Sequence, residues 1–144
     1  MHHFRKTRKV YTKRNKDDET AAIVCTLCNA VNAERSIAEN EAAVVVRNRV
    51  AYDVFEGYRT TGEHYMVLPK KHRESFNECT DEEKLGMMNL IAQFENVGFN
   101  IYARGKGNPN RSQPHQHTHL IRLVDKPARF TMYIGKPYFV AHID

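Results

Sequence analysis

The chain has 144 residues, a formal net charge of +5 and 41% hydrophobic residues. This length and composition predict one globular domain, and no apolar run approaches the roughly 20 residues that would span a bilayer. No signal peptide is visible, because the basic N-terminus has no apolar stretch behind it, so we expect a cytoplasmic protein without membrane association.

The positive charge is concentrated at the N-terminus. Residues 1–16 hold seven Lys or Arg residues and no acid, so the rest of the chain carries a net charge of about −2. This segment also lacks an apolar period, which predicts a flexible basic tail over 1–18 and a single domain over 19–144. Such a tail could contact the phosphate backbone of a nucleic acid.

Residues 21–34 form a short, mostly apolar stretch that predicts one or two turns of helix around a cysteine pair. Residues 41–52 are rich in β-branched side chains and predict a buried strand. Residues 53–63 are polar and contain two glycines, so we expect a loop. Residues 64–72 then predict a strand that Pro69 stops, because proline has no N–H for a central ladder.

Residues 80–99 give the clearest helical signal. Thr80 followed three positions later by Glu83 is a capping box, and Gly98 is placed to end the helix. The predicted apolar stripe, with Leu90 and Val97 beside it, consists of Leu85, Met88, Ile91 and Phe94.

The remainder predicts strands and one loop. Residues 99–104 read as a strand with Phe99, Ile101 and Ala103 on one face, 105–114 as a loop, and 115–124 as a second strand. Residues 129–144 offer one or two more strands, broken at 135–137. Strands around one long helix with hairpin-length links predict an α+β fold with an antiparallel sheet.

His115, His117 and His119 alternate along the predicted strand 115–124 and would therefore point the same way. A solvated edge-strand face would explain one such histidine better than three. A three-histidine metal site is a second interpretation, although one strand suits tetrahedral geometry poorly. The third is nucleophilic catalysis by a neutral imidazole whose other nitrogen donates its proton to a fixed acceptor.

The three cysteines do not suggest a disulfide framework, because their number is odd and nothing indicates export. Cys25 and Cys28 form a CxxC pair, which could be half of a zinc site or a thiol redox pair. Cys79 lies just before the helix cap, and we expect it to be structural only.

Several segments together resemble the histidine-triad (HIT) superfamily. "HQHTHLI" is similar to the family's His-x-His-x-His followed by apolar residues, and "GEHYMVLPKKH" to its strand that runs through Pro-Lys to a histidine. "CTLC" and "TDEEKLGMMNLIAQF" occupy the positions of a CxxC and of the long helix in bacterial-type members. "SQPHQH" and "VVVRNRVAY" also resemble the branch of dinucleoside polyphosphate phosphorylases and galactose-1-phosphate uridylyltransferase.

The resemblance implies a HIT-like α+β fold: an antiparallel sheet of about five strands, one long helix, a short N-terminal helix, and assembly into a homodimer. It also implies an enzyme in which His117 attacks the α-phosphorus of a nucleotide and forms a nucleotidyl-histidine, which water or phosphate then resolves. His119 would hold phosphate or leaving-group oxygens. The other implied or suggested substrate contacts are Asn48 at the ribose, and Asn110, Ser112 and the loop cation Arg104.

The resemblance further implies a structural zinc ion (Zn2+) held by Cys25, Cys28, His72 and His115, a donor set that fills a tetrahedral site. His64 is the competing ligand for the place of His72. In the alternative interpretation, these residues are strand-end histidines and buried, reduced cysteines.

The sequence is consistent with two classes of function. One is a nucleotide hydrolase or nucleotidyl transferase acting on a phosphoramidate or dinucleoside polyphosphate through His117. The other is a nucleic-acid or nucleotide-binding module that uses residues 1–16 and a structural zinc knuckle, whose binding would fall steeply with salt. Lys106 and Arg111 add positive charge to the loop and could bind extra phosphates or simply be solvated.

Overall fold

The computed structural model describes residues 25–32, 36–49, 53–55, 58–59, 61–109, 111–123, 128–133 and 139–143. The predicted basic tail, with its suggested role in nucleic-acid binding, and Asn110 lie outside these ranges. No helix among the described residues is long and apolar enough to cross a bilayer.

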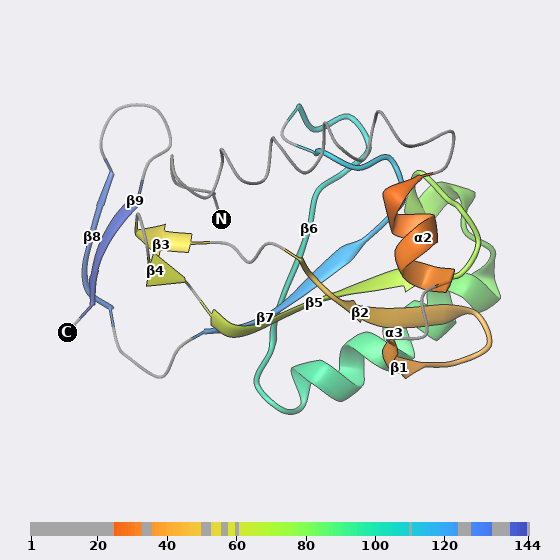
Figure 1. Ribbon diagram of the computed structural model, residues 1–144, viewed down its shortest axis with the longest axis horizontal. Coiled ribbons are helices and arrows are strands. Elements are labelled where there is room, and N and C mark those ends of the chain that lie inside the picture. The colour runs from red at the N-terminus through yellow and green to blue at the C-terminus, as the bar shows by residue number, and fades with distance from the viewer. Residues whose placement is uncertain are drawn as a thin grey trace.

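A five-stranded antiparallel sheet forms the centre of the molecule, in the order β1-β2-β5-β7-β6. Its strands are β1 (Ser36–Glu39), β2 (Ala43–Arg47), β5 (Thr61–Pro69), β6 (Asn100–Ala103) and β7 (Thr118–Leu123). Two further antiparallel pairs, β3 (Asp53–Phe55) with β4 (Tyr58–Arg59) and β8 (Ala128–Tyr133) with β9 (Phe139–Ile143), lie at one end of the sheet (Figure 1). The α+β prediction is confirmed.

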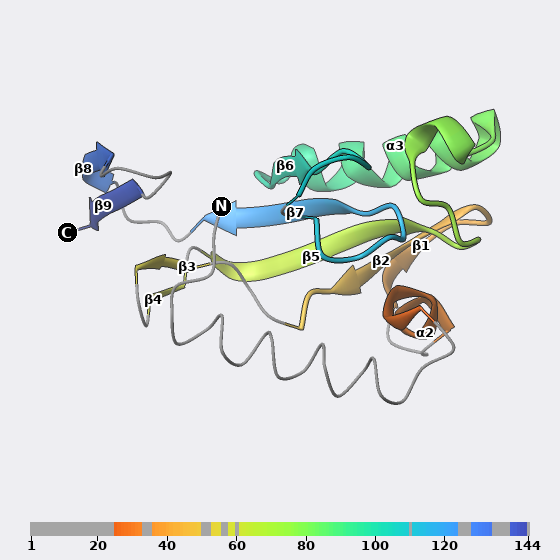
Figure 2. The same cartoon turned by 90° about the horizontal axis from the view of Figure 1, so that it is seen from above.

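Two helices cover opposite faces of this sheet: α3 (Asp81–Glu95) on one side and α2 (Thr26–Asn32) on the other (Figure 2). A short 3-10 turn, η1 (Phe76–Glu78), precedes α3. Because both faces are covered, alternate residues of β2 and β5 enter different cores, and four of the five residues of β2 are buried. The predicted strand 41–52 is thus confirmed over residues 43–47.

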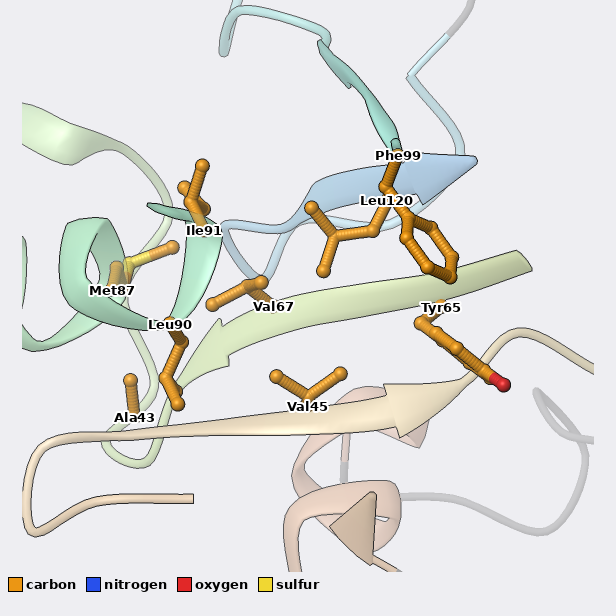
Figure 3. Packing of buried hydrophobic residues seen from close by; sticks show 9 residues of the cluster. All are labelled: Ala43, Val45, Tyr65, Val67, Met87, Leu90, Ile91, Phe99 and Leu120. Carbon is orange, nitrogen blue, oxygen red and sulfur yellow. The ribbon is translucent and has the colours of Figure 1, made fainter. Parts of the chain in front are cut away.

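The core beneath α3 joins helix and strand side chains (Figure 3). It consists of Ala43, Val45, Tyr65, Val67, Met87, Leu90, Ile91, Phe99 and Leu120. The second core, beneath α2, is smaller and consists of Leu27, Val44, Val46, Met66 and Leu68. The alternation of strand residues between these two cores determines which of them face α2, and therefore on which face the histidine row lies.

The predicted ends of the long helix are confirmed, and its predicted apolar face is confirmed in part, at Leu90, Ile91 and the partly buried Phe94. Thr80 Oγ1 accepts from the N–H of Glu83, the Glu83 carboxylate accepts from the N–H of Thr80, and Gly98 has φ of 90°. However, Leu85 and Met88 are 62% and 59% exposed. A spacing of three residues lags the helical turn by roughly 60° at each step, so Leu85 and Phe94 cannot share a face. The buried side chains are those of Glu83, Met87, Leu90 and Ile91.

Three strand predictions also need correction. The predicted loop 53–63 contains β3, β4 and the start of β5, because its valine and aromatic residues favour extended backbone more than its polarity suggested. The fifth strand of the main sheet is β1, which the sequence pattern did not indicate, whereas the C-terminal strands pair with each other. Phe99, which precedes β6, is buried, but Ile101 and Ala103 of β6 are exposed, since α3 packs mainly over β2 and β5.

Gly86 marks the closest approach of α3 to the turn between β1 and β2. Asn40 Nδ2 donates to the carbonyl of Gly86 at 2.8 Å, and a Cβ at Gly86 would lie 2.9 Å from the Cβ of Ala42. We expect Gly86→Ala to destabilise the protein. Crowding against backbone-fixed Ala42 costs about 1–3 kcal/mol, whereas the gain in helix propensity is about 1 kcal/mol.

Urea unfolding of Gly86→Ala measures this effect, with Gly107→Ala as the control because nothing lies within 4 Å of a Cβ there. The free energy of unfolding should fall by about 1 kcal/mol in the first variant and change by less than about 0.5 kcal/mol in the second. A stabilised Gly86→Ala would show that the helix moves away from the turn at little cost.

Candidate functional site

The histidine row lies on the face of the sheet that carries α2, where β7 begins. His119 pairs with Met66 of β5 and with Tyr102 of β6, and Met66 belongs to the core beneath α2. The three histidines are not on one strand as predicted, because β7 starts at Thr118. The N–H of Gln116 donates to the carbonyl of Arg73 at 2.6 Å instead of to a ladder partner, so His115 and His117 lie in the segment before the strand.

This arrangement separates the histidines into two groups. The ring of His115 lies 4.9 Å from that of His72, whereas the rings of His117 and His119 are 5.0 Å apart and perpendicular. All three imidazoles are buried, with exposed fractions of 0%, 6% and 4% in chain order. One group therefore faces the cysteines, and the other forms a separate cluster.

The first group brings together Cys25, Cys28, His72 and His115, whose candidate ligand atoms all lie within 4.8 Å of one another. Cys28 Sγ is 3.2 Å from Nδ1 of His72 and 3.4 Å from Nδ1 of His115, and Cys25 Sγ is 4.0 Å from the latter atom. Ligand atoms on a tetrahedral zinc ion are roughly 3.3–3.8 Å apart, from bond lengths of about 2.0–2.3 Å. These residues fit a metal ion with little movement.

The tautomer of His115 also suits a metal ligand. Its Nε2 lies 3.0 Å from the carbonyl of Pro69, so Nε2–H donates there and the lone pair of Nδ1 points to the cysteines. Burial lowers the pKa of His115, which keeps the ring neutral, and the Pro69 carbonyl opposes this shift. Burial and the neighbouring Cys25 raise the pKa of the Cys28 thiol to about 11. Such a thiol is a poor redox nucleophile, which does not favour the thiol redox interpretation.

His117 has the opposite tautomer to His115. Its Nδ1 lies 2.8 Å from the carbonyl of His115, so Nδ1–H donates to the backbone and Nε2 keeps its lone pair. Burial lowers the pKa of His117, the carbonyl of His115 opposes this shift, and the positive charges of Arg111 and Arg104 lower it further. The imidazole is therefore neutral at pH 7, with a fixed tautomer.

His119 belongs to a chain of polar side chains across three strands. Its Nδ1 lies 2.9 Å from Nε2 of His64, so one ring donates and the other accepts, and Nδ2 of Asn48 lies 3.1 Å from the same His64 atom. Tyr102 stacks on His119, and its hydroxyl oxygen accepts from Nε of Arg104 at 3.1 Å. The structure thus places His64 beside His119 and places His72, not His64, beside the cysteines.

The predicted loop residues fall in different surroundings. Ser112 is exposed on the loop before His115, and Lys106 forms ion pairs with Glu74 and Glu78 at 2.9 and 2.7 Å. Lys106 is therefore engaged in surface ion pairs, and the suggestion that it binds phosphate is not supported. Cys79 is buried, and its thiol donates to the carbonyl of Ser75, as expected for a structural residue.

Arg111 has a larger part in this site than the sequence indicated. Its guanidinium donates to the carbonyls of Gln113 and Pro114 at 3.0 and 2.8 Å and to Oε1 of Gln116 at 3.4 Å. All three acceptors are uncharged, and buried Nη1 has no hydrogen-bond partner within the described part of the chain. Arg111 thus holds the turn before the histidines and leaves a positive charge near His117.

Comparison with solved structures identifies the fold. A histidine triad protein from Clostridium difficile matches with a TM-score of 0.54 and 18% identity, covering 76% of this chain and 97% of that protein. A HIT family hydrolase from Legionella pneumophila matches with 0.51 and 16%, covering 79% and 99%. A zinc-bound histidine triad family protein from Mycobacterium smegmatis matches with 0.54 and 18%, covering 72% and 77%.

The sequence comparisons add nothing to this result: no family model matches the chain, and no curated protein matches it. The similarity is therefore one of structure. It confirms the fold that the motifs had implied, while the low identities leave the activity to be argued from the site.

Proposed function

We propose that this chain, which has the histidine-triad fold, is a HIT superfamily enzyme: a nucleotide hydrolase or nucleotidyl transferase that acts at an α-phosphate. The observation that carries the proposal is the fixed tautomer of His117, whose Nδ1–H donates to the carbonyl of His115. A buried, neutral imidazole with one free lone pair is the form that attacks phosphorus.

The reaction proceeds in two displacements. Nε2 of His117 attacks the α-phosphorus, the bond to the leaving group breaks, and a nucleotidyl-histidine forms. Water or inorganic phosphate then attacks the same phosphorus and restores the imidazole. The carbonyl of His115 stabilises the positive ring in the intermediate, because it accepts from Nδ1–H throughout.

Other side chains near His117 contact the substrate or stabilise negative charge on it. His119 contacts phosphate or leaving-group oxygens, and its orientation is held by His64. Arg104 and Arg111 stabilise the charge that develops on the phosphate oxygens, since both lie close enough to affect His117 electrostatically. Asn48, Ser112 and Asn110 remain proposed substrate contacts.

We also propose that Cys25, Cys28, His72 and His115 bind a structural zinc ion. The donor set and the free Nδ1 of His115 support this, as does the zinc-bound protein of the same fold from Mycobacterium smegmatis. Four protein ligands leave no open position for substrate, so the role is structural. The ion would connect α2 to the segment that carries His117.

A substrate panel tests the function. Purified protein is incubated with adenosine and guanosine phosphoramidates, dinucleoside polyphosphates and nucleoside diphosphates, with and without inorganic phosphate. A nucleoside monophosphate product in both conditions indicates a hydrolase, and a nucleoside diphosphate formed only with phosphate indicates a phosphorylase. If no compound turned over and none bound, the enzyme proposal would be wrong.

The exposed edge of the sheet supports the proposed homodimer. Within the described residues, β6 pairs only with β7, and its Ile101 is 47% exposed. An exposed sheet edge of this kind can pair with the same edge of a second chain.

We expect sedimentation equilibrium to give the mass of two chains for the wild type and of one chain for Ile101→Glu, because the new charge would be buried in the dimer interface. Ile37→Glu on the opposite edge strand is the control and should stay dimeric, since Ile37 is equally exposed at 46%. A monomeric wild type, or dissociation by Ile37→Glu alone, would contradict the proposal.

A further inference from the structure

We propose that the ion pair between Arg73 and Glu83 is a positioning device that fixes His117 from the N-terminus of α3. Arg73 Nε donates to Glu83 Oε2 at 2.9 Å, and Nη2 donates to Oε1 at 3.1 Å. This role rests on the proposed function of His117, but the contacts themselves are independent of any substrate.

The carboxylate of Glu83 is held from two sides. Besides the guanidinium, its Oε2 accepts from the N–H of Thr80 at 2.9 Å, as part of the capping box of α3. Glu83 is only 6% exposed, and hydrogen bonding to Arg73 lowers the pKa of its carboxyl, so the pair is ionised at neutral pH. A two-point, partly buried pair of this kind fixes direction as well as distance.

Arg73 transmits this fixed position to the histidine segment through its backbone. The carbonyl of Arg73 accepts from the N–H of Gln116 at 2.6 Å, and Gln116 lies between His115 and His117. Gln116 is 2% exposed, so no water can replace this partner without opening the segment. The capping box, the ion pair and the Gln116 hydrogen bond thus form one continuous connection.

This connection fixes the orientation of His117, which the metal cluster does not contact directly. The cluster holds the ring of His115, but His117 is oriented by the backbone carbonyl of His115, whose direction depends on the peptide that joins His115 to Gln116. The Gln116 N–H belongs to that same peptide unit. Without the Arg73 restraint, this peptide can rotate, and Nδ1–H of His117 loses its aligned acceptor.

Glu83→Gln tests the proposal, because glutamine still completes a capping box while the charge of the pair is lost. We expect kcat to fall roughly tenfold or more with KM changed by less than about twofold, since the reacting group is misdirected while binding remains. The amide hydrogen of Gln116 should exchange faster by a similar factor. Asp81→Asn is the control: it removes one negative charge from the same helical turn, but the Asp81 side chain is 94% exposed and forms an ion pair with Lys84.

Activities are measured well below the thermal midpoint of each variant, so that a loss of stability alone leaves kcat unchanged. Exchange at Gln116 is compared with exchange at buried Val67 in the centre of the sheet, because a general loss of stability speeds both. Arg73→Lys, which keeps the charge but not the two-point contact, should lie between wild type and Glu83→Gln. Wild-type values of both quantities in Glu83→Gln would overturn the proposal. If the wild type itself had no activity, the proposed function would fail, and unchanged exchange at Gln116 would then decide against the positioning role separately.

Discussion

Replacing His117 with alanine should reduce turnover by roughly 10⁴-fold or more, as expected when the nucleophile of a covalent mechanism is removed. Within the described part of the site, His115 also directs a ring proton to a backbone carbonyl, that of Pro69, but its other nitrogen does not face the same space as that of His117. His119 is engaged with His64, and His115 directs its free nitrogen at the cysteines. The measurement is kcat/KM for the best substrate in the panel.

The covalent intermediate separates loss of chemistry from loss of fold. A substrate labelled at the α-phosphate should leave acid-labile label on wild-type protein quenched during turnover, and none on His117→Ala. His119→Gln is the matched variant: glutamine is a polar side chain that can still contact oxygens, so turnover should fall less and label should still appear. Label on His117→Ala, or activity within tenfold of wild type, would assign the attack to another group.

The metal ligands illustrate what local sequence can predict. The pairs Cys25 with Cys28 and Pro69 with His72 were recognisable as short motifs, and the structure brings all the predicted ligands together. The resemblance indicated His72 as a ligand and left His64 as its competitor. Only the pairing of β5 with β7 shows that His64 lies next to Ile121 and reaches His119 on the neighbouring strand, while His72 lies beyond the strand end.

The histidine row shows why the rest could not be predicted. Alternation along the chain suggested one strand with three parallel side chains, but a single tertiary hydrogen bond from Gln116 to Arg73 removes the first part of the row from the ladder. That contact joins residues more than forty positions apart, so no local pattern contains it. The role of Arg73 depends on the same segment and had no signal in the sequence, whereas Arg111 was indicated there only as a loop cation that could bind phosphate.

Loss of the metal site should have the second largest effect. We expect Cys28→Ser to bind no zinc and to lower the free energy of unfolding by about 3 kcal/mol or more, which corresponds to roughly 10 °C in Tm for a domain of this size. Cys28 is the residue to change because its Sγ lies within 3.4 Å of both imidazoles. The measurements are zinc content by elemental analysis and thermal unfolding with and without a chelator.

Cys79→Ser is the matched control, since Cys79 is buried but lies outside the cluster and contacts the Ser75 carbonyl. It should retain zinc and its sensitivity to the chelator, whereas Cys28→Ser should be insensitive. Below its lowered Tm, Cys28→Ser should still form the labelled intermediate, because the cluster holds His115 while the attacking nitrogen belongs to His117. Complete loss of label from folded Cys28→Ser would show that the metal takes part in the chemistry. A wild type that takes up no added zinc would show that the proposal of a zinc site is wrong.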